Sequence, residues 1–475
     1  MLDFSIAMQL ARVIVFCYVA AMNAFYLLLG LYAVAGTGVS LVVMRQAKSQ
    51  RGYFVADGAL GWIVAAMTYA ATTFSAFMMV GLMGWSYQHG IGTLIFELVY
   101  LVSAVVLLAW LGPRIWDLAH RHSLVSPMEL LKLRYGDWTA RLGAIVAAVA
   151  LVPYTSAQVI GLAIVMEGFG LNYPSGVAVA TGIIAVWALI GGLRGVAITD
   201  ALQGALMVSA AILALVWTTG RFEGVTLSTF PNTFWTPRTF INITLPWAFF
   251  ALTNPQVVQR IFVLKQRSDL HKMVVLFAAF GLLYTLIVTF IGFSARFGTE
   301  QGLLPLVETR DGVIVALLQR MGSGLALFVA LSIVFAAVST SNSILLTLSS
   351  MVSRDLARQD RNARIGRIAL VILTVVIGAF ALQRPGTILE LSVASSRLLL
   401  VFVPLMLGVL FAPRAATFAG LLPLLVGFPA AVALGRFVPR YSSATTLGLV
   451  TVLFFCGLLL DRRTRSASGG GVQAS

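Results

Sequence analysis

The sequence predicts an all-α polytopic membrane protein with about thirteen transmembrane helices, since one crossing needs roughly 20 apolar residues. Of its 475 residues, 59% are hydrophobic and only 10% are charged. The mean hydropathy is +0.95, and apolar runs long enough to cross a bilayer recur almost from end to end. So few residues lie between these runs that we expect no catalytic domain in the loops.

The predicted spans follow one another with short connections. They run approximately over residues 18–44, 62–90, 93–113, 139–168, 173–191, 193–219, 242–264, 271–297, 322–353, 365–384, 386–411, 414–436 and 443–460. The ninth is longer than an upright crossing requires, so we expect it to tilt or to extend beyond the bilayer.

Two of these spans are interrupted by polar residues near their middle. Thr72, Thr73 and Ser75 break the second span, and the Thr-Asn-Pro sequence of residues 253–255 breaks the seventh. Proline frees a backbone carbonyl, and Asn or Thr can satisfy part of what is lost. Either break alone could be an ordinary kink. Their separation by five spans favours an inverted repeat of five plus five helices with discontinuous first helices and a binding site at the midplane.

Positive charge is concentrated in alternate loops. The net charge is +15, and clusters of Lys and Arg lie within residues 45–51, 114–141, 260–272, 354–367 and 462–465. By the positive-inside rule these loops are cytoplasmic, with the N-terminus outside and the C-terminus inside. The charge therefore indicates topology, in a bacterial or archaeal cytoplasmic membrane, and no nucleic-acid partner. The only two cysteines, Cys17 and Cys456, predict neither a disulfide framework nor a metal cluster.

Residues 339–343, Ser-Thr-Ser-Asn-Ser, place five consecutive polar side chains inside the ninth span. Hydroxyls in membrane helices often bond back to the preceding turn or mark close packing, and this reading suits Ser349 and Ser350. Five consecutive positions cover more than half of the helix circumference and cannot all lie on one packing seam. Hydroxyls here, with carbonyls from an unwound helix, would supply neutral oxygen ligands for a hard cation such as Na⁺.

Asp200 lies about two turns inside the sixth span. A carboxylate within a membrane is costly and is therefore a candidate functional group. It could bind a second cation or carry a proton. The structural alternative is a partner for Arg194 or a hydrogen-bonded residue near the membrane interface.

Two long motifs resemble the signatures of the sodium:solute symporter family. GGLRGVAITDALQGALM, from residue 191, is similar to one signature, and AAVSTSNSILLTLSSMVSRDL, from residue 336, is similar to the other. The likeness covers most of residues 50–411 in the same order. It implies a LeuT-type fold, with one extra helix before a ten-helix core and two helices after it.

The resemblance also implies a first sodium site. Its ligands would be the backbone carbonyls of Ala71 and Phe74 on the broken first core helix, with Ala336, Ser339 and Thr340 on the eighth core helix. Some family members hold a second sodium ion at positions that match Asp200, Ser339, Asn342 and Ser343. Asn342 stands where a serine is more usual.

This reading divides the chain into five parts. They are an extra helix and basic loop (1–57), the first repeat (58–220), the second repeat (221–411), two accessory helices (412–461) and a disordered tail (462–475).

The solute site is expected beside the two breaks. Its predicted residues are Thr72, Thr73, Ser75, Ala76, Tyr154, Gln158, Trp247, Ala251, Asn254 and Arg397. Arg397 is a permanent cation in an apolar helix, so it either pairs with Glu390, two turns away, or docks a solute carboxylate.

The function expected from these features is secondary active symport of a small organic solute with Na⁺. The solute would be a monocarboxylate, a pantothenate-like acid or an amino acid, and the partners are the solute, the ion and the bilayer, with no further cofactor or obligate protein partner. Coupling to protons is the alternative. A membrane enzyme is disfavoured because the four histidines lie in or beside loops, and a sensor because about fifteen residues follow the last span.

Overall fold

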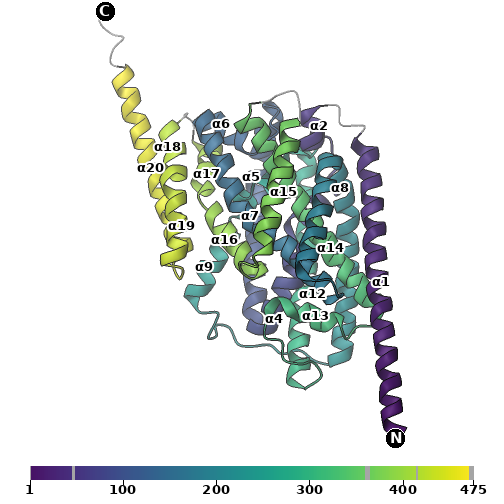
Figure 1. The fold of residues 1–475 in the computed structure, drawn as a ribbon. Helices are drawn as coiled ribbons and strands as arrows, with labels where there is room; N and C mark the ends of the chain where they lie inside the picture. Colours follow the sequence, from purple (N-terminus) through teal and green to yellow (C-terminus); the bar gives the residue numbers. More distant parts are fainter. Residues whose placement is uncertain (1, 45–48, 359–363, 413–415, 470–475) are drawn as a thin grey trace, which may run out of the picture.

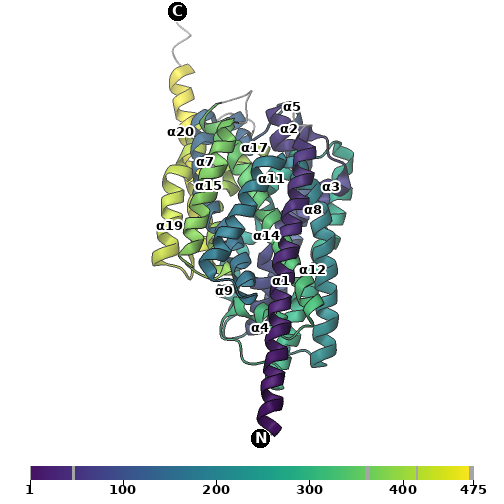
Figure 2. The same ribbon diagram turned by 45° about the vertical axis from the view of Figure 1, so that its right-hand side comes forward.

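The computed structural model describes residues 2–44, 49–358, 364–412 and 416–469 as one bundle of long helices. Figure 1 shows α1 and α20 on opposite sides of this bundle, and in both views (Figures 1 and 2) the start of α1 and the end of α20 lie at opposite ends. Within the described residues the only bridge of strand type joins Leu60 and Leu264. The all-α prediction is confirmed.

The long helices are α1, α5, α7, α8, α12, α14, α15 and α20. Their bounds are Leu2–Met44, Ile91–Arg121, Asp137–Gly168, Tyr173–Phe222, Leu270–Glu300, Ser323–Met351, Arg364–Leu382 and Ser442–Gly469. The shorter helices are α2 (Gln50–Val55), α6 (Met128–Tyr135), α13 (Val313–Leu318), α16 (Ile388–Leu399), α17 (Phe402–Phe411), α18 (Thr417–Leu422) and α19 (Phe428–Phe437). The described part of the expected tail continues α20 to Gly469, and residues 470–475 lie outside the described residues.

Ten described helices are long and apolar enough to cross a membrane, and two bent pairs raise the number to twelve. Both bent pairs fall on predicted spans, the second and the eleventh. The remaining predicted span, the seventh, is divided into α9 (Pro237–Ala248), α10 (Phe250–Thr253) and α11 (Pro255–Phe262), none of which is long enough by itself. The count of thirteen therefore depends on this broken segment.

The predicted break in the second span is present. It separates α3 (Trp62–Thr73) from a π-helical turn, η2 (Phe77–Leu82), that leads into α4 (Met83–His89), with a bend of 47°. Phe74 leaves the helical region with ψ of 88°. The Ser75 hydroxyl then accepts a hydrogen bond of 3.1 Å from the Phe77 amide, which gives the new helix an N-terminal cap.

The predicted break in the seventh span is also present. Asn254, between α10 and α11, is extended with φ −86° and ψ 111°. Pro255 explains this conformation, because a proline ring disfavours the helical region for the residue before it. Proline is at the same time well suited to the first position of α11.

The long helix α8 contains the predicted boundary between the fifth and sixth spans. Gly192 adopts φ 52° and divides α8 into two membrane-length parts. A Cβ at this position would lie 3.0 Å from the carbonyl oxygen of Tyr53 on α2. Glycine is therefore required both by the dihedral angle and by the close approach of α2.

Helix α14 occupies the middle of the bundle, where it packs against α3, α7, α8, α11 and α15. All of its residues from Ser332 to Met351 are buried. A further π-helical turn, η5 (Val352–Leu356), extends it beyond the predicted end of the ninth span.

The chain segments that begin α3 and follow α11 are joined by backbone hydrogen bonds. The Leu60 amide donates to the Val263 carbonyl, and the Lys265 amide donates to the Leu60 carbonyl, both at 2.9 Å. The two discontinuous helices are thus tied together at the same end of the bundle.

Candidate functional site

The first predicted sodium site is assembled where α3 ends and α14 passes it. The last amide bonded along α3 is that of Phe74, which donates to the Ala70 carbonyl at 2.7 Å. The next carbonyl, that of Ala71, accepts hydrogen bonds from Ser339 Oγ at 3.2 Å and from Thr340 Oγ1 at 3.0 Å. Ser339 also donates to the Ala336 carbonyl at 3.0 Å.

Four of the five predicted ligands of this site therefore lie together. Ala336, Ser339 and Thr340 are spaced i, i+3 and i+4, so they share one face of α14. All are fully buried, or nearly so, and their polar atoms are neutral oxygens, which is the donor set that a hard monovalent cation accepts. Phe74, the fifth, is also fully buried, and its ring stacks on Phe277 and Phe280.

The second predicted cation site contains an arginine. Asp200 Oδ2 accepts a hydrogen bond of 2.6 Å from Thr68, and Thr68 Oγ1 accepts one of 3.2 Å from Nε of Arg260. Nη2 of Arg260 donates to Ser343 Oγ, and Ser343 lies 2.8 Å from Thr72 Oγ1. Asp200, Arg260 and Ser343 are all fully buried.

This position of Arg260 corrects the sequence reading, which counted it among the basic loop residues. It lies in the last turn of α11, all of whose residues are buried, and its side chain points into the bundle. Asn342, the unusual residue of the predicted second site, is buried too, and its Oδ1 has no hydrogen-bond partner among the described residues.

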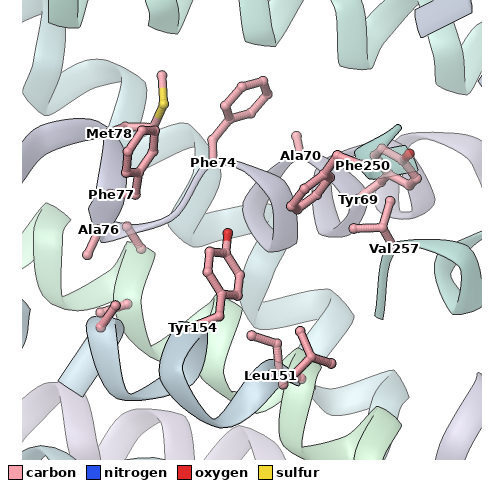
Figure 3. Close-up of a cluster of buried hydrophobic side chains, with 14 of the residues drawn as sticks. Tyr69, Ala70, Phe74, Ala76, Phe77, Met78, Leu151, Tyr154, Phe250 and Val257 are labelled. Atoms are coloured by element: carbon pink, nitrogen blue, oxygen red, sulfur yellow. The ribbon is translucent and has the colours of Figure 1, made fainter. Parts of the chain in front are cut away.

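Most of the predicted solute residues lie at the two breaks, beside a cluster of aromatic rings around Trp247. Trp247 stacks on Phe250 at 5.5 Å between centroids and contacts Phe77 and Tyr100 at 5.1 Å. Its Nε1 is buried without a partner in the described structure. Figure 3 shows the Tyr154 hydroxyl pointing toward the unwound segment between α3 and η2.

Polar residues of the predicted solute site serve partly structural roles. Oε1 of Gln158 accepts a hydrogen bond of 3.2 Å from the Ala76 amide, which holds the unwound segment to α7. Thr73 bonds back to the Tyr69 carbonyl at 2.8 Å, and Asn254 accepts one of 3.3 Å from Gln256. Ala251 is buried on α10.

Arg397 does not lie with this group. Its Nη1 donates to Ser442 Oγ at 3.1 Å, at the start of α20, and its guanidinium occupies the space beside Gly435 of α19. The predicted pair with Glu390 is not formed either. Glu390 forms a capping box with Thr387 at the start of α16 and lies 3.8 Å from Arg310.

Glu97 was missed by the sequence reading. It lies on α5, it is fully buried, and neither of its carboxylate oxygens has a hydrogen-bond partner among the described residues. One turn later on the same helix face is Tyr100, which contacts Trp247. The signal was available, because Glu97 is the only charged residue of the predicted third span.

A cavity of about 760 Å³ opens at one end of the bundle. Residues of both charges line it, namely Glu167, Glu308, Arg310, Asp311, Arg384 and Glu390. Asp311 is 8% exposed, and one of its oxygens accepts a hydrogen bond of 3.2 Å from the Ile388 amide. Burial raises the pKa of the Asp311 carboxyl to about 6.

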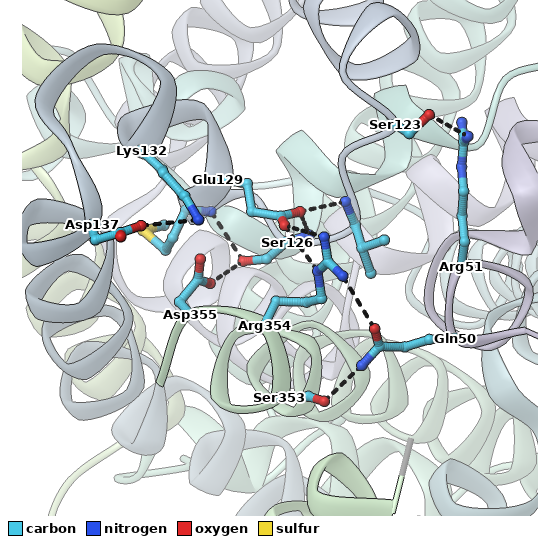
Figure 4. Close-up of polar contacts among 12 residues, drawn as sticks. Gln50, Arg51, Ser123, Ser126, Glu129, Lys132, Asp137, Ser353, Arg354 and Asp355 are labelled. Atoms are coloured by element: carbon cyan, nitrogen blue, oxygen red, sulfur yellow. Dashed lines mark hydrogen bonds and ion pairs between the residues drawn. The ribbon is translucent and has the colours of Figure 1, made fainter. Parts of the chain in front are cut away.

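At the opposite end, a polar network joins the α5–α6 connection to the end of α14 (Figure 4). Glu129 binds the guanidinium of Arg354 at 2.6 and 2.8 Å, and its other oxygen accepts the amides of Val125 and Ser126. Ser126 also donates to Asp355. Deeper in the same region, Gln259 of α11 donates to the Val125 carbonyl and to Ser350 of α14, and accepts from Thr347. This network ties α11 and the α5–α6 connection to the end of α14.

Comparisons with known proteins identify the family. The model of the sodium:solute symporter family matches residues 53–427. The sodium/pantothenate symporter of Escherichia coli is 28% identical over 436 residues, covering 83% of this chain and 87% of that protein. The osmoregulated proline transporter OpuE of Bacillus subtilis is 23% identical over 393 residues, covering 76% and 78%.

Solved structures show the same fold. A Na⁺-coupled sialic acid symporter in a substrate-bound, outward-open state superposes with a TM-score of 0.77 at 18% identity, over 92% of this chain and 98% of that one. The nucleobase-cation-symport-1 transporter MHP1 superposes with a TM-score of 0.61 at 14% identity, over 88% and 96%.

Proposed function

The chain belongs to the sodium:solute symporter family, and from this premise we propose that it imports a small carboxylate-bearing solute together with Na⁺. The family membership makes it a multi-pass membrane transporter that couples solute movement to sodium. The solute, the ligand residues and the orientation in the membrane are the proposed parts. A pantothenate-like acid, another monocarboxylate or an amino acid such as proline is the proposed cargo.

The observation that carries the proposal is the contact of Ser339 and Thr340 with the Ala71 carbonyl. Na⁺ would be held by the oxygens of Ala71, Ala336, Ser339 and Thr340, with the carbonyl of Phe74 as the fifth ligand. An ion at this point would tie the broken α3 to α14. Its loss would release them, which is how ion binding would bias the transporter between outward-open and inward-open states.

The electrochemical gradient of one Na⁺ suffices for concentrative uptake. An elementary charge moving through 100 mV releases about 2.3 kcal/mol. A tenfold concentration gradient adds about 1.4 kcal/mol. Together these sustain an accumulation of roughly several hundredfold for a solute without net charge, such as a zwitterionic amino acid. With a monoanion one Na⁺ moves no net charge, so the concentration gradient alone drives uptake and sustains about tenfold.

The proposed solute site lies between the two breaks, against Trp247 and Tyr154. The named relatives transport pantothenate and proline, both of which carry a carboxylate, and this supports the same class here. The unpartnered oxygens of Glu97 would accept hydrogen bonds from the hydroxyl or ammonium end of such a solute. The indole Nε1 of Trp247 would donate one in return.

The proposed orientation places the N-terminus outside the cell and the C-terminus inside. The cavity beside Asp311 would then be the outer entrance, and the network of Glu129 and Arg354 would close the inner end. The proposed inverted repeats are residues 58–220 and 221–411, with residues 412–461 as accessory helices.

Uptake by purified protein in liposomes tests the function. Radiolabelled pantothenate and proline are offered with an inward gradient of Na⁺, of K⁺ or of H⁺ alone. Uptake of one solute that requires the Na⁺ gradient supports the proposal. Uptake that follows the H⁺ gradient and ignores Na⁺ would overturn the ion assignment and favour proton coupling.

A further inference from the structure

We propose that Arg260 is a built-in cation that fills the second cation site, so that each transport cycle carries a single Na⁺. The inference rests on the proposed function for the first site, which holds that ion. It concerns the group formed by Thr68, Thr72, Asp200, Arg260 and Ser343, here called the arginine site.

The hydrogen-bond directions at the arginine site commit its hydroxyl oxygens to the guanidinium, while Oδ1 of Asp200 and Nη1 of Arg260 have no hydrogen-bond partner among the described residues. Thr68 has one hydroxyl proton, which goes to Asp200, so its oxygen accepts from Arg260 Nε. Ser343 accepts from Arg260 Nη2, so its own proton is free to go to Thr72. A metal ion at these oxygens would compete with the guanidinium for the lone pairs that both require.

The net charge of the arginine site also disfavours a second Na⁺. A carboxylate and a guanidinium that are both fully buried leave the arginine site with no net charge. A second Na⁺ would make it positive in a region without solvent, which is unfavourable because an uncompensated buried charge is costly. The first site has no cationic side chain among its ligands, and there the ion supplies the only positive charge.

The arginine site joins four helices, and the Arg260 guanidinium can hold them together whether or not an ion is bound. Thr68 is on α3, Asp200 on α8, Arg260 on α11 and Ser343 on α14, so the guanidinium links both discontinuous helices to the body of the bundle. A dissociable ion would make this link only when bound. An arginine makes it without ion binding.

The number of bound ions is the direct test. Purified protein is titrated with ²²Na⁺ in a scintillation proximity assay, which counts ions without requiring transport. Wild-type protein is expected to bind about one ion per chain with a Hill coefficient of about one. The variant Arg260→Met keeps most of the side-chain volume and removes the charge, and it is expected to bind about two ions. A count of about two for wild-type protein would overturn the inference.

Three further variants separate the possible outcomes. Adding Asp200→Asn to Arg260→Met should return the count to about one, because the site is again neutral. Arg260→Lys should stay at about one. Asp200→Asn alone covers the case in which Arg260→Met does not fold. If Asp200 is no sodium ligand, this variant keeps one ion and the wild-type Hill coefficient, and loss of an ion from it contradicts the inference.

Failure of the proposed function gives a different result. In that case wild-type protein binds no Na⁺ at all, and Ser339→Ala changes nothing. Two ions in wild-type protein with a loss of one in Ser339→Ala would leave sodium coupling standing and reject only the role of Arg260.

Discussion

Thr340 of α14 donates a hydrogen bond of 3.0 Å to the carbonyl oxygen of Ala71, at the point where α3 unwinds. Two residues separated by 269 positions thus meet at the only stretch of α3 whose carbonyls have lost their helical partners. Ser339 makes the same contact at 3.2 Å. The geometry couples whatever binds at this point to the break itself.

Removal of these hydroxyls should weaken sodium dependence. We expect Ser339→Ala and Thr340→Val each to raise the Na⁺ concentration for half-maximal uptake by about tenfold or more, the effect of losing a ligand worth about 1.4 kcal/mol. Uptake against Na⁺ concentration in liposomes measures this. Ser332→Ala is the matched control, because its hydroxyl is buried on the same helix and bonds only to the Val329 carbonyl. Equal sodium dependence in all four proteins would contradict the assignment.

Glu97→Gln should have opposite effects on solute affinity and on stability. The carboxyl is buried and has no hydrogen-bond partner among the described residues, so we expect the carboxamide to raise the melting temperature of the solute-free protein. The affinity for solute should fall by about tenfold, as expected for a lost hydrogen bond from the ligand. Thermal unfolding with and without solute gives both quantities. Glu300→Gln, which alters an exposed pair with Arg296, serves as the control. A variant with unchanged affinity would exclude Glu97 from the solute site.

Asp311 should make stability depend on pH. Burial raises the pKa of its carboxyl from 3.8 to about 6, the nearby Glu390 acts in the same direction, and the Ile388 amide opposes both. Between these pH values the folded state binds a proton that the unfolded state has released, so stability should fall as the pH rises from about 4 to about 6. At 1.36 kcal/mol per pKa unit the loss is at most about 3 kcal/mol.

The check is thermal unfolding from acid to neutral pH in wild-type protein and in Asp311→Asn. The asparagine keeps an acceptor for the Ile388 amide but cannot ionise. Its unfolding curve should therefore lack this part of the pH dependence, and a slope identical to that of wild-type protein would show that Asp311 is not its source.

If the pair of Glu129 and Arg354 closes its end of the bundle as proposed, breaking it should open that end. Glu129→Gln keeps an acceptor for the amides of residues 125 and 126 but loses the ion pair, which is mostly buried and worth about 1–3 kcal/mol. In protein whose two native cysteines are replaced by alanine, a cysteine at Ser75 reports access to the break. In inside-out vesicles, we expect a membrane-impermeant thiol reagent to label this cysteine faster in the Glu129→Gln variant than in the parent protein.

The neighbouring variant Lys132→Gln provides the control for this experiment. It removes an exposed ion pair with Asp137 at the same end of the bundle, and exposed pairs contribute little. Labelling should stay at the level of the parent protein. If both variants are labelled faster, or if neither is, the ion pair of Glu129 and Arg354 is not what closes this end of the bundle.

The sequence predicted the features that depend on local chemistry. A proline after Asn254 and a cluster of hydroxyls near Ser75 favour interrupted helices, their separation by five spans strengthened that expectation, and both breaks are present. The meeting of Ala71 with Ser339 and Thr340 came from the resemblance to a family, since nothing local links positions so far apart.

The sequence failed where a side chain's environment depends on distant helices. Arg260 lies in the last turn of a short helix beside a basic loop, and charge counting could not reveal that α11 turns this side chain into the bundle. Arg397 was expected either to pair with Glu390 on its own helix or to dock a solute carboxylate, whereas the structure gives it Ser442 of α20 as a partner. Glu97 shows the opposite error, because a lone acid in an apolar span was already reason to expect a function.

The hydrogen bonds between Leu60 and the segment after α11 use main-chain atoms alone. The hydrogen bonds themselves do not depend on which side chain stands at position 60, although the Leu60 side chain is buried and another apolar residue is needed there for packing. Proline at position 60 or 265 is the exception, since it lacks the donor. Homologous transporters could therefore differ in the residues at positions 60, 263 and 265 and still keep their two broken helices joined at this end.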